Sequence, residues 1–151
     1  MNVARKTAVI AAGYLVACAV ASAVAVAVML APTVLPDGGR YGSIFAFISD
    51  FLPGAAIGLF YTILCAWPGF IAAIALGELY SWERWRDYAF AGLVNVAPSL
   101  AVFSMYAGSP FEAPLIVLAN FPGGFAGGAA YWFAAGRLIA RWRYIAPAEA
   151  A

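Results

Sequence analysis

The sequence contains no histidine and few charged residues. Histidine is absent from all 151 residues, and Asp, Glu, Lys and Arg together make up 10%. Because histidine is the commonest metal ligand and general base, its absence argues against haem, zinc and histidine-based hydrolytic chemistry. A typical soluble domain carries about 25% charged residues, so the scarcity of charge also argues against a soluble fold.

Cysteine is almost as scarce. The two cysteines, Cys18 and Cys65, lie far apart, and neither belongs to the Cys-x-x-Cys pair that marks a zinc or redox site. Both fall in apolar stretches, where a buried thiol behaves as a small hydrophobic group. We therefore expect no metal site, no cofactor and no catalytic residue, and we predict a protein that is not an enzyme.

The sequence is instead rich in apolar residues, which make up 66% of it. Uncharged runs of 30, 27, 24 and 24 residues follow Lys6, Asp50, Asp87 and Glu112. A helix needs roughly 20 residues to cross the hydrocarbon of a bilayer. The sequence thus predicts an all-α integral membrane protein, a single domain over 1–151, whose spans cover 8–31, 53–77, 88–106 and 113–137.

The positive charges indicate how these spans are oriented. With the N-terminus in the cytoplasm, seven basic residues fall inside and only Arg40 falls outside. Lys and Arg near span ends are retained on the cytoplasmic side. We therefore predict a four-helix bundle in the bacterial inner membrane with both termini cytoplasmic. The inside residues are Arg5, Lys6, Arg84, Arg86, Arg137, Arg141 and Arg143.

Aromatic residues alternate with the basic residues at the predicted cytoplasmic ends. Trp82 and Trp85 flank Arg84 and precede Arg86, and Trp142 lies between Arg141 and Arg143, shortly after Arg137. Trp and basic residues gather at membrane interfaces in this way. We interpret them as interfacial anchors in contact with the lipid bilayer, and expect no nucleic-acid binding because no separate basic domain is present.

The N-terminal apolar run has a second interpretation. Arg5-Lys6 followed by Ala and Val, with Leu15-Val16-Ala17-Cys18 resembling a lipoprotein cleavage motif, also describes a signal peptide. The apolar residues continue to Pro32, which is too long for the hydrophobic part of such a peptide. We expect the first span to stay intact.

The start of the second span is ambiguous. Residues 41–52 are apolar and aromatic, and they fit either an interfacial helix or the outer end of a long second helix. Pro53 suits the first turn of a helix and has Asp50 nearby, so we favour a break there. Further along, Pro68 predicts a kink, which is a shape feature more often than a gate or binding site.

Two kinds of residue point to close helix packing. Asn95 lies near the middle of the third span, where an amide more often bonds across a helix interface than lines a polar path. Gly123 and Gly127, like Gly124 and Gly128, are four residues apart, and Gly54 and Gly58 repeat this spacing after a similar Pro-Gly. Such glycines allow another helix to approach closely. The partner is by default a span of the same chain, the alternative being a homo-oligomer or another membrane protein.

Two stretches carry a resemblance to a known group of proteins. Ile71–Glu78 with Trp85–Tyr88, and Gly124–Arg137, resemble small four-span inner-membrane proteins of alphaproteobacteria, especially rhizobial types. The resemblance covers about a third of the chain. It implies location and topology, and it implies no activity.

The polar and small residues of the predicted spans bear on the function of the protein. The glycine pairs and the absence of charge deep in any span favour a non-enzymatic accessory or structural subunit acting through helix contacts. The alternative is a small transporter or channel for an ion or hydrophobic solute. Transport sites usually keep an intramembrane charge, whereas Asp50, Glu78 and Glu112 all lie at predicted span ends.

Overall fold

The computed structural model describes residues 3–31, 44–107 and 114–145, and the elements in these ranges are all helical. In chain order the elements are α1 (Val3–Leu30), α2 (Ile44–Leu79), α3 (Trp85–Val94), α4 (Val96–Ala107), α5 (Pro114–Tyr131), the π-helical turn η3 (Trp132–Gly136) and α6 (Arg137–Ile145). Because α5, η3 and α6 follow one another without a gap, they form one continuous helix.

Three helical segments are long and apolar enough to cross a membrane. They are Val3–Leu30, Phe47–Leu79 and Trp85–Met105, and only 6% of the most apolar part of the second is buried inside the structure. Apolar surface of this extent would favour aggregation in water, whereas in a bilayer it contacts lipid chains. The chain therefore has the helices of a membrane protein. The 18-residue α5, which contains Asn120, Pro122 and four glycines, is not among these segments.

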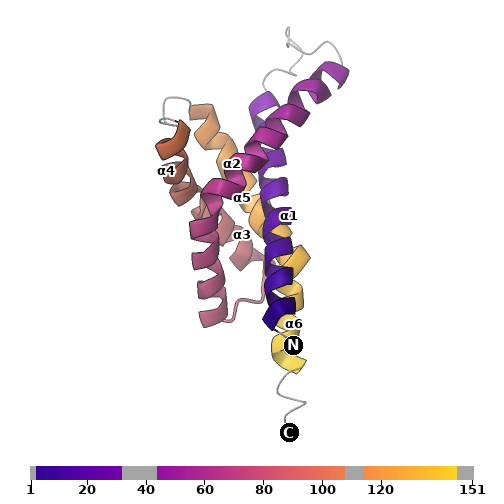
Figure 1. Cartoon of the computed structure of the whole chain (residues 1–151), viewed down its shortest axis with the longest axis vertical. Helices are drawn as coiled ribbons and strands as arrows, with labels where there is room; N and C mark the ends of the chain where they lie inside the picture. Colours follow the sequence, from indigo (N-terminus) through magenta and orange to yellow (C-terminus); the bar gives the residue numbers. More distant parts are fainter. Residues whose placement is uncertain (1–2, 32–43, 108–113, 146–151) are drawn as a thin grey trace.

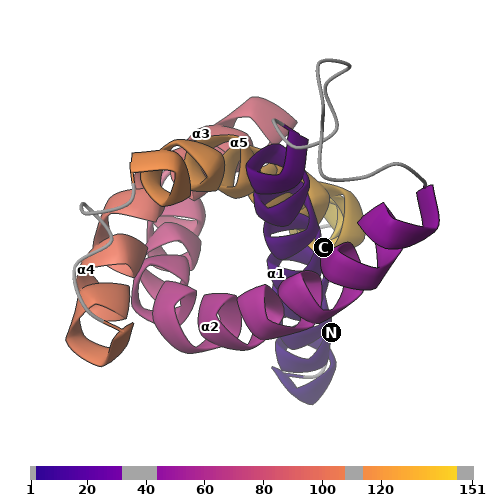
Figure 2. The same ribbon diagram turned by 90° about the horizontal axis from the view of Figure 1, so that it is seen from above.

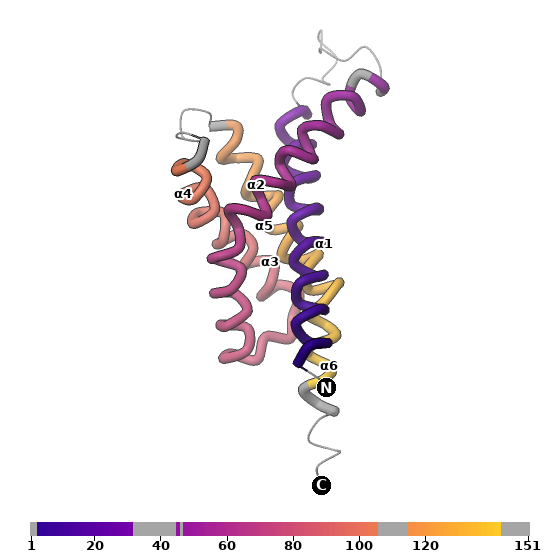
Figure 3. Tube along the Cα trace, in the orientation of Figure 1, coloured from indigo at the N-terminus to yellow at the C-terminus, as the bar shows by residue number. Residues whose placement is uncertain are grey.

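The second predicted span begins earlier than expected. The break at Pro53 is wrong, because α2 starts at Ile44 and continues through both Pro53 and Pro68. Of the suggested interfacial helix, 41–43 lie outside the described residues and 44–52 form the first turns of α2. Each proline removes one backbone hydrogen bond, which a bent helix tolerates, and α2 changes direction along its length (Figures 1 and 3).

The predicted third span consists of two helices. Asn95 separates α3 from α4. Pro98 has no N–H to donate to the carbonyl of Val94, and its ring clashes with that carbonyl. The backbone of Asn95 itself stays near the α-helical region, at φ −65° and ψ −14°. The interruption of the helix at Asn95 is therefore confined to one residue.

The helices surround a common centre (Figure 2). α5 packs against α1 on one side and α3 on the other, while α2 packs against α1 and α4. The N-terminus of α1, the C-terminus of α2 and the start of α3 lie at the same end as α6 (Figure 1). We call this the basic end, after Arg5, Lys6 and Arg84, and we call the opposite end, with Leu30 and Asp50, the open end.

The compact core lies toward the basic end. It contains the buried residues Tyr88, Tyr131, Ala135 and Ile139, which belong to α3, α5, η3 and α6. Three contacts tie the helices together there. Lys6 Nζ lies 3.0 Å from Glu78 Oε1, the Arg5 guanidinium lies 5.7 Å from the Trp142 ring, and Trp132 Nε1 donates to the carbonyl of Glu83. The open end has no comparable cluster of buried side chains among the described residues.

Candidate functional site

The glycines of α5 contact two different helices. A Cβ at Gly127 would lie 2.9 Å from the Ala17 carbonyl oxygen, and one at Gly123 would lie 2.7 Å from that of Ala21. Both carbonyls belong to α1. At these two positions, therefore, the α1 backbone comes so close that any side chain on α5 would displace it.

The second glycine pair of α5 faces α3. A Cβ at Gly128 would collide with the carbonyl oxygen of Tyr88, and one at Gly124 would lie 2.6 Å from that of Gly92. Gly92 is itself in reciprocal contact with Gly124 and Gly128. α5 is thus held between α1 and α3 by two adjoining rows of glycine.

Gly54 and Gly58 of α2 contact α1. A Cβ at Gly58 would lie 2.6 Å from Ser22 Oγ, and one at Gly54 would lie 3.2 Å from Val26 Cγ1. Ser22 Oγ also donates to the carbonyl of Ala55, at 2.8 Å. All six glycines singled out in the sequence therefore face helices of the same chain.

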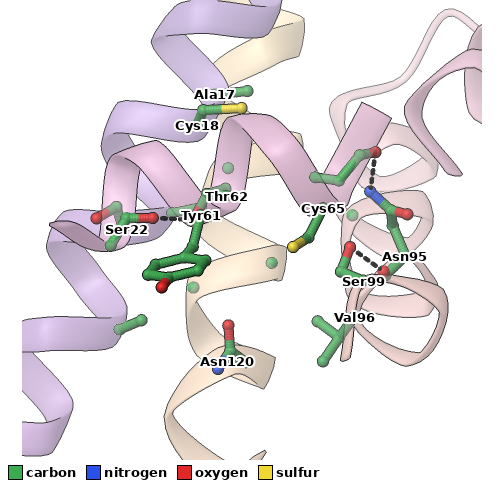
Figure 4. A pocket seen from close by; sticks show the side chains of 18 of the residues that line it. Ala17, Cys18, Ser22, Tyr61, Thr62, Cys65, Asn95, Val96, Ser99 and Asn120 are labelled. Atoms are coloured by element: carbon green, nitrogen blue, oxygen red, sulfur yellow. Dashed lines mark hydrogen bonds between the residues drawn. The ribbon is translucent and has the colours of Figure 1, made fainter. Parts of the chain in front are cut away.

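Between these helices lies a cavity of about 480 Å³. It extends from Leu30 and Asp50 at the open end to Tyr131 in the interior, and α1 to α5 all contribute to its wall. Side chains of α1, α2, α4 and α5 converge on it in Figure 4. Its volume falls in the range of small-molecule sites, which are about 300–1,000 Å³. Most of its lining is apolar, as is usual for such sites.

Four aromatic rings in mutual contact line the cavity toward the basic end. Tyr14 lies 4.4 Å from Phe70, Phe70 lies 5.2 Å from Tyr131, and Tyr131 lies 5.6 Å from Tyr88, measured between ring centroids. The four come from α1, α2, α5 and α3, so one ring from each helix contributes to what we call the aromatic floor. The compact core continues beyond it toward α6.

The serine and threonine hydroxyls that line the cavity bond to the backbone. Ser22 Oγ donates to Ala55, Thr62 Oγ1 donates to the carbonyl of Gly58 at 2.7 Å, and Ser99 Oγ donates to that of Asn95 at 2.7 Å. A serine or threonine hydroxyl has a single proton to donate. Toward the cavity these three groups can therefore act only as acceptors.

Asn95 joins α3 to α2. Its Nδ2 donates to the carbonyl of Ala66 at 3.2 Å, and its side chain lies on Gly69, where a Cβ would collide with Oδ1. Asn95 Oδ1 is buried and accepts no hydrogen bond in the described structure. This contact lies next to Pro68, so the amide braces α2 where the proline removes a backbone bond.

Other residues singled out in the sequence occupy separate places. Cys18 and Cys65 are both buried free thiols in the cavity wall. Trp82 contacts the Tyr88 ring and Trp85 contacts the Phe125 ring, at 5.8 Å and 6.2 Å. Arg84, Arg86, Arg137 and Arg141 lie toward the basic end, and the side chain of Arg143 is outside the described part of the chain.

The cavity and three further glycines were not anticipated from the sequence. Gly13 faces Tyr131 and Ala135, Gly69 faces Asn95, and Gly92 faces α5. None of these three glycines has another glycine four residues away. The sequence signal for close contacts was therefore only the small size of Gly13 and Gly92 on apolar helices. Within the described residues, no three His, Cys, Asp or Glu side chains are grouped as a metal site requires.

Comparison with known proteins adds no further constraint. No family model, no curated protein and no solved structure matches the chain.

Proposed function

We propose that the chain is a non-enzymatic protein of the bacterial inner membrane that binds an apolar small molecule in the cavity between its helices. This corresponds to the small-transporter alternative of the sequence analysis, with binding as its first step. The observation that carries the proposal is the cavity of about 480 Å³, which the aromatic floor lines toward the basic end. An apolar molecule in a concave apolar cavity contacts wall atoms on several sides, so it gains more dispersion energy than it would on one exposed helix face.

The proposal includes four spans with both termini in the cytoplasm. The spans are α1, α2, α3 with α4, and α5 continuing into η3 and α6. Support comes from the charges, since the basic side chains of the described residues gather at the basic end while Asp50 lies at the other. Lys and Arg favour the cytoplasmic side. In this orientation the end of the cavity that Leu30 and Asp50 line faces away from the cytoplasm.

A role through helix contacts with a partner has less support. The main sequence argument for such a role is the glycine pairs, and in the structure these pairs face α1 and α3 of the same chain. An accessory subunit or homo-oligomer would therefore have to use other surfaces. The rhizobial inner-membrane resemblance fits either role, since it concerns topology alone.

Binding can be tested with a neutral apolar fluorophore, N-phenylnaphthylamine, and protein in phosphatidylcholine nanodiscs. Thr62 lines the cavity and its hydroxyl bonds only within its own helix, so Thr62→Trp fills the space without breaking a contact between helices. We expect saturable binding that Thr62→Trp weakens by about tenfold or more, a change of about 1.4 kcal/mol.

The matched control is Phe60→Trp, two residues away. Phe60 is 64% exposed and is not part of the cavity wall. Its replacement adds the same side chain on the outer face of α2, so the affinity should stay within about twofold of the parent, which is under 0.5 kcal/mol. Binding no greater than in empty nanodiscs, or equal affinity of folded Thr62→Trp, would overturn the proposal.

A further inference from the structure

We infer that the cavity selects apolar molecules that carry a hydroxyl group over those that carry none, with that hydroxyl bound between Tyr61 and Asn120. This inference rests on the proposed function, because it names the class of molecule that the same cavity accepts.

Two half-buried polar side chains of the cavity wall have hydrogen-bonding capacity that the described part of the chain does not use. The Tyr61 ring of α2 packs 5.3 Å from that of Phe103, and its hydroxyl makes no hydrogen bond there. Asn120 of α5 donates from Nδ2 to the carbonyl of Ile116 at 2.7 Å, while its Oδ1 accepts no hydrogen bond there. Buried polar groups in folded proteins nearly always have a partner. Both groups are therefore open to an occupant of the cavity.

These two side chains enter the cavity from different walls. In Figure 4 the Tyr61 ring extends into it from α2, and the Asn120 oxygen points into it from α5. An amide oxygen can only accept a hydrogen bond, whereas a tyrosine hydroxyl can both donate and accept. An alcohol or phenol on the occupant can donate to Asn120 Oδ1 and accept from Tyr61. An ether or a ketone has no proton for the amide.

The other polar groups of the wall are less complementary to such a hydroxyl. The hydroxyls of Ser22, Thr62 and Ser99 have donated their protons to backbone carbonyls, so each can offer only a lone pair. Asn95 Oδ1 accepts no hydrogen bond in the described structure, but it lies against Gly69 of α2. The pair of Tyr61 and Asn120 therefore combines a donor with an acceptor as these other groups do not.

The positions of the pair along their helices indicate how the molecule lies. Tyr61 precedes Phe70 of the aromatic floor by nine residues of α2, which is about 14 Å of helix. Asn120 precedes Tyr131, also of the floor, by eleven residues of α5, or about 16 Å. The two polar groups thus lie at similar distances from the floor. A molecule whose hydroxyl binds them directs its apolar body toward the aromatic rings.

The experiment compares 4-hydroxybiphenyl, 4-methylbiphenyl and 4-methoxybiphenyl as competitors of N-phenylnaphthylamine in phosphatidylcholine nanodiscs. A methyl group has nearly the size of a hydroxyl, and the methoxy oxygen accepts a hydrogen bond without donating one. Each titration is corrected for partitioning into empty nanodiscs and for the affinity of the fluorophore itself. We expect 4-hydroxybiphenyl to bind about fivefold more tightly than either of the others, a change of about 1 kcal/mol.

Two variants test the assigned position. Tyr61→Phe removes the hydroxyl and keeps the ring against Phe103, and Asn120→Leu breaks only a hydrogen bond within α5. Each should reduce the preference for 4-hydroxybiphenyl over 4-methylbiphenyl to about twofold or less. The affinity for 4-methylbiphenyl should stay unchanged. Because the preference is a ratio measured within one variant, a general change of the cavity does not imitate this result.

The matched control is Tyr14→Phe. It removes a hydroxyl from the same cavity wall, but one that already donates to the carbonyl of Ile63 at 2.7 Å. The preference for 4-hydroxybiphenyl should therefore persist. Its loss in Tyr14→Phe and retention in Tyr61→Phe would contradict the assigned position.

The outcomes distinguish the two proposals. If the fluorophore binds but the three biphenyls compete equally, as they would if water kept both polar groups satisfied, the hydroxyl preference is wrong and the binding function stands. The same holds if the preference survives both Tyr61→Phe and Asn120→Leu. If neither the fluorophore nor any biphenyl binds, the binding function fails and the hydroxyl preference fails with it.

Discussion

A single amide connects the two helices that proline interrupts. Asn95 lies at the junction of α3 and α4 and donates to Ala66, close to Pro68 in α2. Its side chain occupies the space that a Cβ on Gly69 would take. A hydrogen bond of this kind within a membrane contributes about 1 kcal/mol to stability. The packing of the Asn95 side chain on Gly69 therefore contributes as much to the contact as the hydrogen bond does.

We predict that Gly69 and Asn95 are energetically coupled. Gly69→Ala should destabilise the protein by about 1–3 kcal/mol, because the new Cβ displaces the amide and overpacks the contact. Asn95→Ala should remove most of that penalty, so the double variant should be more stable than the sum of the two single changes by at least about 0.5 kcal/mol.

The measurement is the free energy of unfolding of the three variants in mixed micelles titrated with SDS. Ser99→Ala serves as the control, because its hydroxyl bonds only to the carbonyl of Asn95 one turn earlier. Additive effects of Gly69→Ala and Asn95→Ala would contradict the coupling.

At the scale of helices, the glycines differ in what they face. A Cβ on Gly128 meets the backbone of α3 at Tyr88 and Ala89, whereas one on Gly54 meets a methyl of Val26 at 3.2 Å. Backbone cannot move aside as a side chain can, so equal substitutions should have unequal costs.

We predict that Gly128→Ala destabilises the protein by about 2 kcal/mol, because α5 and α3 are forced apart. Gly54→Ala should stay within about 1 kcal/mol of the parent, since alanine also favours the helix over glycine. Unfolding in mixed micelles measures both. Equal costs for the two changes would show that the α3–α5 contact is looser than the structure has it.

The sequence predicted helices better than it predicted their ends. Long uncharged runs required apolar helices around α1, α2 and α3 with α4, and these helices are present. Pro53 was read as a helix start because its missing N–H suits a first turn, but the apolar residues before it continue the helix and one lost bond does not stop it. At Asn95 the reverse occurred, because Pro98 interrupts a stretch that was expected to be one helix.

The candidate site was less accessible to sequence reasoning. Spacing places Asp50, Gly54 and Gly58 on one face of α2, and small residues such as Ala21 on α1 indicate close approach. Whether helices that touch at these points also enclose a space depends on how they bend and diverge, which no local pattern encodes. The cavity and the aromatic floor are therefore properties of the assembled bundle.

At the scale of the whole molecule, the proposed topology places the two ends of the bundle in different compartments. We predict that Phe45→Cys, in the first turn of α2, reacts with a membrane-impermeant maleimide on intact cells. Glu83→Cys, between α2 and α3, should react only after the cells are permeabilised. Both positions are exposed, so a difference in labelling reflects the compartment.

The background for this labelling is a chain in which Cys18 and Cys65 are replaced by alanine. Both native thiols are buried, at 3% and 4% exposure, so their removal should not alter the topology. Labelling of Glu83→Cys on intact cells together with protection of Phe45→Cys would mean that the orientation is inverted.

The position of α1 has a consequence for how the protein is made. α1 is synthesised before α5, yet the face that carries Ala17 and Ala21 is covered by Gly127 and Gly123 of α5, which follows α2, α3 and α4 in the chain. Until then that alanine face lies open to lipid or to whatever assists insertion. A chain that ended after α4 would lack the helix that packs against this face of α1, so it would expose surface that the complete bundle buries and would be prone to misassembly.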